Sequence, residues 1–146
     1  MNRIWGLLLL APLAACNGSV EDKAVQACET VFAALEAGQP PEKSGKAKLE
    51  KKELQGDRVH LLIHGPNGLG EMIFTDLNCM FKLDRQPTER DATLKLSKIE
   101  IGRSPESVSR VDSYLKDQGH KTVTERLKEK GLDAILPSET KIKLKD

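Results

Sequence analysis

The sequence predicts an α+β fold: an N-terminal helix packed on a three- to four-stranded antiparallel meander sheet, followed by two short helices. Three observations predict this class. Apolar residues recur at helical spacing between residues 19 and 37, alternate with polar residues in several segments between 47 and 102, and return to short helical stripes after residue 104. The 146 residues suffice for one ordinary domain, and an apolar fraction of 38% is typical of a globular chain.

The first helix is expected at residues 19–37. Ser19 is a candidate N-cap, and Asp22 can supply the carboxylate of a capping box. Gly38 suits the C-terminal end, and the prolines at positions 40 and 41 prevent the helix from continuing. One face of this helix is apolar and is expected to lie against the sheet; it carries Ala24, Cys28, Val31 and Leu35.

The sheet is expected to begin as a meander of three strands. They are predicted at residues 47–54, 59–63 and 70–83, with turns at 55–58 and 65–68. Lysines in the first strand indicate an edge position, because charged side chains there discourage unwanted pairing. Its leucines, Leu49 and Leu54, are five residues apart, which fits neither a helical face nor a strand face. An alternative interpretation of the charged segment 42–55 is a basic patch that contacts lipid headgroups or peptidoglycan.

A polar loop over residues 84–91 is expected to lead into a further strand over 92–102. In that strand leucines occupy even positions (94 and 96) and isoleucines occupy odd positions (99 and 101). Both pairs cannot face the core of one regular strand. We therefore predict a β-bulge near Ser97 and Lys98, where one extra residue shifts the alternation.

Two short helices are predicted to follow. Ser104 as N-cap and Pro105 at the first helical position predict a helix that ends at Gly119. A capping box of Thr122 and Glu125 predicts a second helix that Gly131 stops. In the tail, the alternation at residues 142–144 is consistent with a last edge strand.

The opening segment has the anatomy of a secretory signal peptide. Arg3 provides a positive charge, and an apolar stretch of about ten residues follows up to Leu13. This stretch is roughly half of what a helix needs to cross a bilayer. The small residues Ala14 and Ala15 then precede Cys16, as they do at a cleavage site.

The residues Leu13-Ala14-Ala15-Cys16 resemble the lipobox of bacterial lipoproteins. The resemblance implies that the signal peptide is residues 1–15, that Cys16 carries diacylglycerol, and that its new amino group is acylated with a fatty acid such as palmitate. Residues 16–18 would then be a lipidated N-terminus, and residues 19–146 a single α+β domain. Asn17 stands where an Asp would favour retention in the inner membrane, so the resemblance favours an outer-membrane destination. The alternative is an ordinary signal peptide whose next residue is a cysteine by chance.

Once the lipid takes Cys16, one pair of cysteines remains. Cys28 lies on the apolar face of the predicted helix, and Cys79 lies on the apolar face of a predicted strand. An exported protein can form disulfides, so we predict a Cys28–Cys79 bridge between helix and sheet. The alternative is two buried, reduced cysteines. The Ala27-Cys28 helix and the Leu77-Asn78-Cys79 strand, with the Asn67-Gly68 turn, also resemble small bacterial lipoproteins with one such bridge.

The sequence predicts no catalytic residues, no metal site and no cofactor. His60 and His64 lie on one face of a predicted strand but roughly 13 Å apart, at 3.3 Å per residue, and so cannot share an ion; both are expected on the surface. Gly65 and Gly68 precede a strand rather than a helix, which excludes a phosphate-binding loop. Without residues 1–15 the chain has 22 basic and 22 acidic residues, a balance that excludes nucleic acid as a partner.

We therefore expect a lipid-anchored envelope protein without catalytic activity. Its partners would be the membrane, through the N-terminal lipid, and an envelope protein or cell-wall polymer. One alternative is an inhibitor or protective factor against a host or competitor enzyme. Another is a hydrolase, which a large concave pocket with converging polar groups would favour. An exposed apolar patch would favour partner binding instead.

Overall fold

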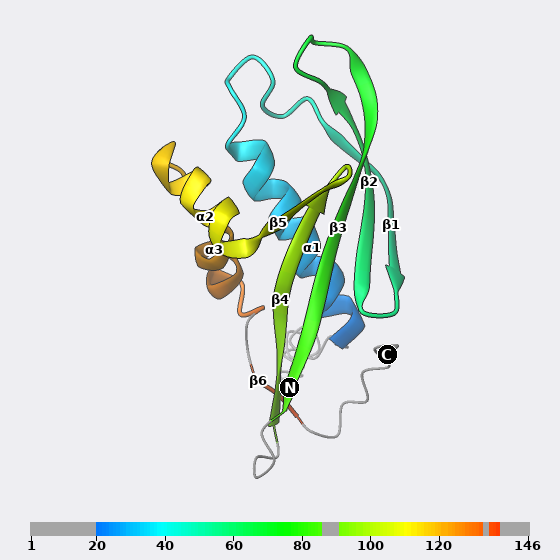
Figure 1. Cartoon of the computed structure of the whole chain (residues 1–146), viewed down its shortest axis with the longest axis vertical. Helices are drawn as coiled ribbons and strands as arrows, with labels where there is room; N and C mark the ends of the chain where they lie inside the picture. Colours follow the sequence, from blue (N-terminus) through cyan, green and yellow to red (C-terminus); the bar gives the residue numbers. More distant parts are fainter. Residues whose placement is uncertain (1–19, 86–90, 133–134, 138–146) are drawn as a thin grey trace, which may run out of the picture.

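The computed structural model describes residues 20–85, 91–132 and 135–137. An antiparallel meander in the order β1-β2-β3-β4-β5 forms the sheet, and the short β6 pairs with the beginning of β4 (Figure 1). The predicted α+β class is confirmed, but the meander has five strands rather than three or four. The elements are α1 (Val20–Ala37), β1 (Lys48–Gln55), β2 (Arg58–Pro66), β3 (Met72–Arg85), β4 (Asp91–Ile101), β5 (Ser104–Ser107), α2 (Val108–Asp117), α3 (Val123–Glu129) and β6 (Ile135–Pro137).

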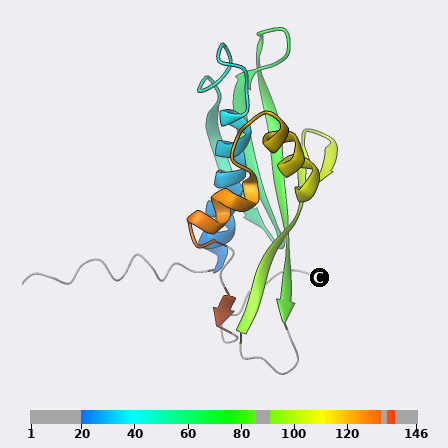
Figure 2. The same ribbon diagram turned by 90° about the vertical axis from the view of Figure 1, so that its left-hand side faces the viewer.

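One face of the sheet is covered by helix and the other is open. Figure 2 shows α1 and α3 on the same side of the strands. Among the described residues no helix lies over the opposite face, which we call the open face. The core lies between α1 and the covered face, with α2 and α3 closing its side. Its fully buried side chains include Val31, Val59, Leu61, Leu77, Ile99, Leu115 and Val123.

Two β-bulges explain the irregular spacing of apolar residues in the sequence. In β4, Met80 pairs with Lys98 and Phe81 with Leu96, so Ser97 is the extra residue and the predicted bulge is confirmed. The Ser97 hydroxyl donates a hydrogen bond to the Met80 carbonyl at 3.0 Å. In β1, the register shifts between Leu49 and Lys51.

The bulge in β1 resolves the spacing of its two leucines. Leu49 pairs with Ile63 and Leu54 pairs with Val59, and all four residues pack in or against the core. One extra residue turns an odd spacing into an even one, so both leucines face α1. The sequence shows the conflict in spacing, but the register decides how it is resolved.

The helix predicted at Ser104 is wrong in its first turn. Residues 104–107 form β5, in which Ser104 pairs with Ile101 across a tight turn at Gly102. Gly102 has φ +63°, a conformation that glycine adopts without strain. The N-cap of α2 is Ser107, whose hydroxyl accepts a hydrogen bond from the Arg110 amide at 3.2 Å. Pairing with β4 outweighs the local Ser-Pro helix signal.

The remaining boundaries agree closely with the expectations. The capping box of Thr122 and Glu125 is present at the start of α3, and the Thr122 amide donates to the Glu125 carboxylate at 2.9 Å. Strand β3 begins at Met72 rather than residue 70, and it extends to Arg85, into the segment predicted as loop. The cap predicted at Ser19 and the strand predicted at residues 142–144 lie outside the described residues.

Candidate functional site

The disulfide fixes the position of α1 on the sheet. Cys28 and Cys79 are bonded, with their Cα atoms 5.7 Å apart, and both side chains are completely buried. The two sulfur atoms thus stand at bonding distance, as the sequence predicts. Cys16 lies outside the described residues. None of the described helices combines the length and apolar character needed to cross a bilayer.

The β2–β3 hairpin exposes a group of large apolar side chains at one end of the molecule. We call this group the apolar tip; it consists of Leu69, Met72, Ile73 and Phe74, with exposed fractions of 85%, 50%, 41% and 62%. Figure 1 shows the hairpin projecting beyond the last turn of α1. Exposed apolar groups of this kind commonly mark interaction surfaces.

The loop of this hairpin is held by one side chain. The Asn67 carboxamide oxygen accepts hydrogen bonds from the Leu69 amide at 2.8 Å and the Glu71 amide at 2.9 Å. The Asn67 backbone adds two more bonds, one to each of Gly70 and Glu71, at 3.0 and 2.8 Å. Gly70 has φ +84°, which favours glycine at that position. Leu69, the most exposed of the large apolar residues described, therefore projects from a restrained loop.

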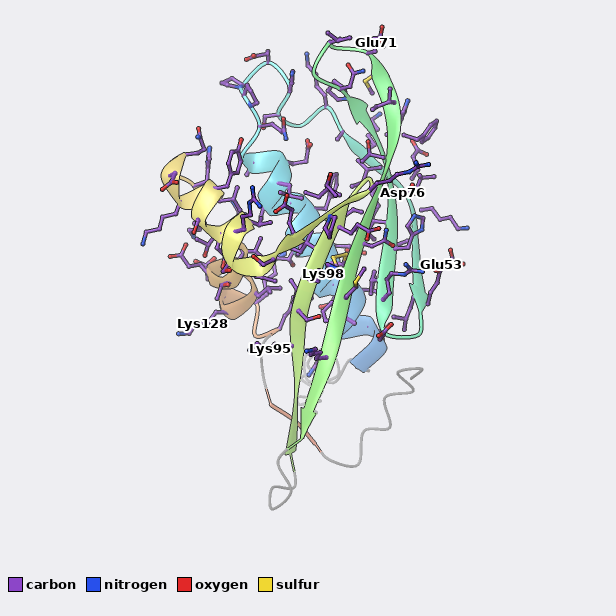
Figure 3. The ribbon with its side chains drawn as sticks, in the orientation of Figure 1. Glu53, Glu71, Asp76, Lys95, Lys98 and Lys128 are labelled. Carbon is purple, nitrogen blue, oxygen red and sulfur yellow. A yellow bond between two sulfur atoms is a disulfide. The ribbon has the colours of Figure 1, made fainter. Side chains whose placement is uncertain are left out.

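Next to the apolar tip, aromatic and polar groups occupy the open face. The rings of His64 and Phe74 stack with centroids 4.4 Å apart, directly across β2 and β3. Further along, His60 Nε2 lies 2.7 Å from the Asp76 carboxylate. Figure 3 shows Asp76 on the side of the sheet away from α1.

A shallow polar hollow of about 290 Å³ lies around this His60–Asp76 pair. Its lining is Gln55, Arg58, His60, Asp76, Asn78, Glu100 and Gly102. The Asn78 side chain is buried there, whereas the Asp76 carboxylate is 57% exposed. Polar residues line the hollow, as in a polar contact surface. Because the hollow is wide and open, it would give a reacting group little protection from water.

The predictions about the histidines hold in part. His60 and His64 lie on the open face of one strand and do not meet, as expected. Both are half-buried by their neighbours rather than freely exposed. In the part of the chain that is described, no three His, Cys, Asp or Glu side chains converge on a position for a metal ion.

A small cavity lies behind the apolar tip on the covered face. It has a volume of about 180 Å³ and is lined by the end of α1, the segment before β1, and β2 and β3. Phe32, Leu35 and Ile63 form part of its apolar wall. This volume is below the range of roughly 300–1,000 Å³ that is usual for small-molecule sites. The cavity is large enough to accept one apolar side chain of a partner.

A larger cleft of about 870 Å³ opens between β4 and the pair α2 and α3. Its hydroxyl and carboxylate groups serve mainly as helix caps. Ser107 caps α2, and Asp112 accepts hydrogen bonds from the first residues of α3, Val123 and Thr124. These groups therefore do not form a nucleophile and base pair.

Comparison with protein-family models, with curated protein sequences and with solved structures finds no match.

Sequence reasoning did not identify the apolar tip. The signal was present, because Met72, Ile73 and Phe74 are three consecutive apolar residues in a strand that otherwise alternates. Such a run puts apolar groups on both faces at once, which a sheet with one covered face cannot bury. Interpreting residues 70–83 as one uniform strand concealed this departure.

Proposed function

We propose that this protein is a lipid-anchored component of the bacterial cell envelope that binds a protein partner through the apolar tip, without catalysis of its own. The exposure of Leu69, Met72, Ile73 and Phe74 is the observation that carries the proposal. An apolar surface supports a protein partner over a cell-wall polymer, whose surface is mainly polar. Lipid attachment at Cys16 remains supported by the Leu13-Ala14-Ala15-Cys16 motif.

The arrangement of the two ends supports a partner away from the anchoring membrane. Helix α1 begins at the end of the molecule opposite to the apolar tip (Figure 1). With a lipid on Cys16, residues 17–19 are the link between the anchor and α1. The 18 residues of α1 span about 27 Å at 1.5 Å per residue. A molecule held at that end would direct its apolar tip away from the bilayer.

The anchor is tested by the Cys16→Ala variant. We expect loss of labelling by a fatty-acid probe and release from the membrane fraction, because the acylated sulfur is gone. Cys28→Ala is the control: it lacks the bridge to Cys79, but its labelling per molecule recovered should match that of the unsubstituted chain. Persistent labelling of Cys16→Ala would refute lipid attachment at this residue.

The partner is tested by photo-crosslinking in intact cells. A photoreactive residue at position 69 or 74 should give a discrete crosslinked protein, and Met72→Ser should weaken that product. The matched control is a photoreactive residue at Glu53, which lies on β1 (Figure 3). An identical pattern from positions 53 and 69, or none from either tip position, would contradict binding through the apolar tip.

A second candidate function is inhibition of an enzyme from a host or competitor. The restrained Asn67–Glu71 loop favours it, because a loop already held in its bound conformation loses little entropy on binding. The crosslinked protein distinguishes the two roles. An inhibitor predicts an enzyme whose activity falls when this protein is added and recovers with Leu69→Gly.

A further inference from the structure

We propose that the partner binds the apolar tip as an extended segment, which adds a β-strand to the free edge of β3 at residues 72–75. This inference rests on the function proposed above, because it specifies how a protein partner binds at that site. The bound segment runs antiparallel to β3 and carries four apolar residues in succession. Its main chain contributes hydrogen bonds, and its side chains contribute specificity.

The first four residues of β3 pair with a strand on one side only. The pairing of β3 with β4 ends at Leu77 and Ile101, whereas the pairing of β3 with β2 continues to Met72. Figure 1 and Figure 2 show the β2–β3 hairpin extending beyond the turn that joins β4 to β5. Within the described chain, no strand lies beside residues 72–75 on the side where β4 would continue.

The free side of this segment presents main-chain hydrogen-bonding groups. The Gly102 amide donates to the Asp76 carbonyl at 2.8 Å, so that carbonyl faces the β4 side. Main-chain groups that face one side of a strand recur at every second residue. Those of Phe74 and Met72 therefore face the same side, past the end of β4. The stacking of Phe74 on His64 agrees, because side chains approach most closely in a pair without mutual hydrogen bonds.

The two outer strands of the sheet differ from this free edge. Strand β1 carries Lys51 and Lys52 and has a bulge, and the four-residue β5 contains Pro105. Lysines, bulges, prolines and short length all discourage the pairing of an edge with another chain. Residues 72–75 are an uncharged, regular run of Met, Ile, Phe and Thr with none of these features. An apolar free edge of this kind is a template for a further strand.

An added strand would place its side chains alternately on the two faces of the sheet. Those opposite Met72 and Phe74 would lie beside exposed apolar groups on the open face. Those opposite Ile73 and Thr75 would lie on the covered face. There, Thr75 and Ile101, the last residue of β4, line the cavity of about 180 Å³. A residue that continues the line of β4 opposite Thr75 would reach this cavity, so both faces favour apolar side chains.

Charged residues at the two ends of the free edge favour one direction for the added strand. Arg103 follows Gly102 in the turn near Thr75, and Glu71 directly precedes Met72; both charged side chains are exposed. Figure 3 shows Glu71 at the far end of the hairpin. An antiparallel strand would run from Arg103 toward Glu71. An acidic residue before its apolar run and a basic residue after it would complement both charges.

The first test is a titration of the full chain carrying Cys16→Ser with a synthetic peptide, Asp-Val-Ile-Val-Ile-Lys, flanked by Gly-Ser at each end. Amide hydrogen exchange measured by NMR is the readout. In the free chain the Phe74 amide should exchange quickly, whereas the Ile73 amide faces β2 and should be protected. The peptide should slow exchange at Phe74 and Met72 at least about tenfold and leave Ile73 unchanged.

Modified peptides distinguish strand addition from other apolar binding. N-methylation of the two isoleucines, whose amides would face Phe74 and Met72, should abolish the protection. N-methylation of the two valines is the matched control and should preserve it, because those amides point away from β3. Exchanging the terminal Asp and Lys should weaken binding by about twofold to fivefold, as expected for exposed ion pairs.

The second test is the crosslinking experiment in cells, with the photoreactive residue at position 69. Met72→Pro and Met72→Ala both remove the thioether side chain, but only proline removes the amide that faces the free edge. Pairing with β2 does not use that amide, so the two variants should have similar unfolding midpoints. Met72→Pro should give at least about fivefold less crosslinked product than Met72→Ala, because one main-chain hydrogen bond is lost.

The outcomes separate this inference from the proposed function. Equal amounts of the discrete product from Met72→Pro and Met72→Ala would overturn strand addition and leave binding through the apolar tip intact. No slowing of exchange at Phe74 by the peptide would also overturn it. So would slow exchange of the Phe74 amide in the free chain, since a second copy or residues 138–146 would then already occupy the edge. Protection by the peptide without any crosslinked product in cells would uphold the strand-binding edge and contradict the proposed function.

Discussion

The two halves of the β2–β3 ribbon have opposite environments, although the same two strands pair without interruption along it. In the half beneath α1, the paired residues Leu61 and Leu77 are 0% and 1% exposed, and Cys79 is fully buried. In the half beyond α1, Ile73 is 41% exposed. Ile73 is four residues from Leu77 and lies on the same side of the strand.

On the covered side of the ribbon, the presence of α1 rather than the strand sequence therefore determines which apolar residues are buried. Helix α1 ends at Ala37, and beyond it the chain passes over β2 at Ala47 and Gly65. The apolar pattern of the strands continues past this boundary. Apolar positions that form core in one half are exposed in the other.

The largest effect on stability is expected from removing the disulfide that links α1 to the sheet. Cys28→Ala with Cys79→Ala opens a loop with a sequence separation of 51 residues, which lowers the free energy of unfolding by about 4 kcal/mol in the chain-entropy model. Denaturant unfolding measures the loss, with Cys16→Ala as the control. A loss below about 1 kcal/mol would show that α1 is held by packing alone.

Two matched variants on β3 test whether α1 covers only one half of the ribbon. Leu77→Ala should lower stability by about 2–5 kcal/mol, because it leaves a cavity beneath α1. Ile73→Ala should cost about 1 kcal/mol or less, since that side chain is already partly in water. Equal losses in thermal unfolding would mean that the two halves are equally covered.

A smaller effect is expected at the boundary between the halves. A Cβ atom at Gly65 would lie 2.7 Å from Ala47 Cβ and 3.1 Å from its Cα, so the crossing segment must shift. Gly65→Ala should therefore destabilise by about 1–3 kcal/mol. Gly68→Ala is the matched control, because a Cβ there meets nothing within 4 Å. Equal free energies of unfolding for the two variants would show that Ala47 does not lie close to Gly65.

The smallest effect on stability is expected at the ion pair between α1 and the edge strand β1. There, Lys52 Nζ of β1 lies 2.8 Å from Glu29 Oε1 of α1. The hydrogen bond to Glu29, and then its charge, raise the pKa of Lys52 above its ordinary value of 10.5. The folded form thus favours charged Lys52. The contribution is complete below the unfolded pKa and is lost as pH rises through the folded pKa.

Lys52→Gln should therefore flatten part of the decline in stability at strongly alkaline pH. Lys51→Gln is the control, because the partner of Lys51 is Glu53 on the same strand. The measurement is urea unfolding across the alkaline range. An alkaline decline that is identical in Lys52→Gln and in the unsubstituted chain would contradict a contribution from this pair.

Local signals predicted most of the elements and one of the key contacts. Helical spacing located α1, the capping box located α3, and the mismatched leucines and isoleucines located the Ser97 bulge. The helix predicted at Ser104 failed because pairing between β4 and β5 is non-local and leaves no local pattern. Among the candidate site residues, Cys28 and Cys79 were found from their faces, whereas the apolar tip was missed.

Local sequence is enough to predict the periodicities, the turn residues and the faces on which the cysteines lie, because these depend on neighbours a few positions away. The extent to which α1 covers the sheet depends on the tertiary structure, and it leaves Ile73 exposed while Leu77 is buried. Strand register likewise places Lys82 directly opposite Lys95 across β3 and β4. These features depend on register and on helix placement between segments far apart in the chain, which no local pattern encodes.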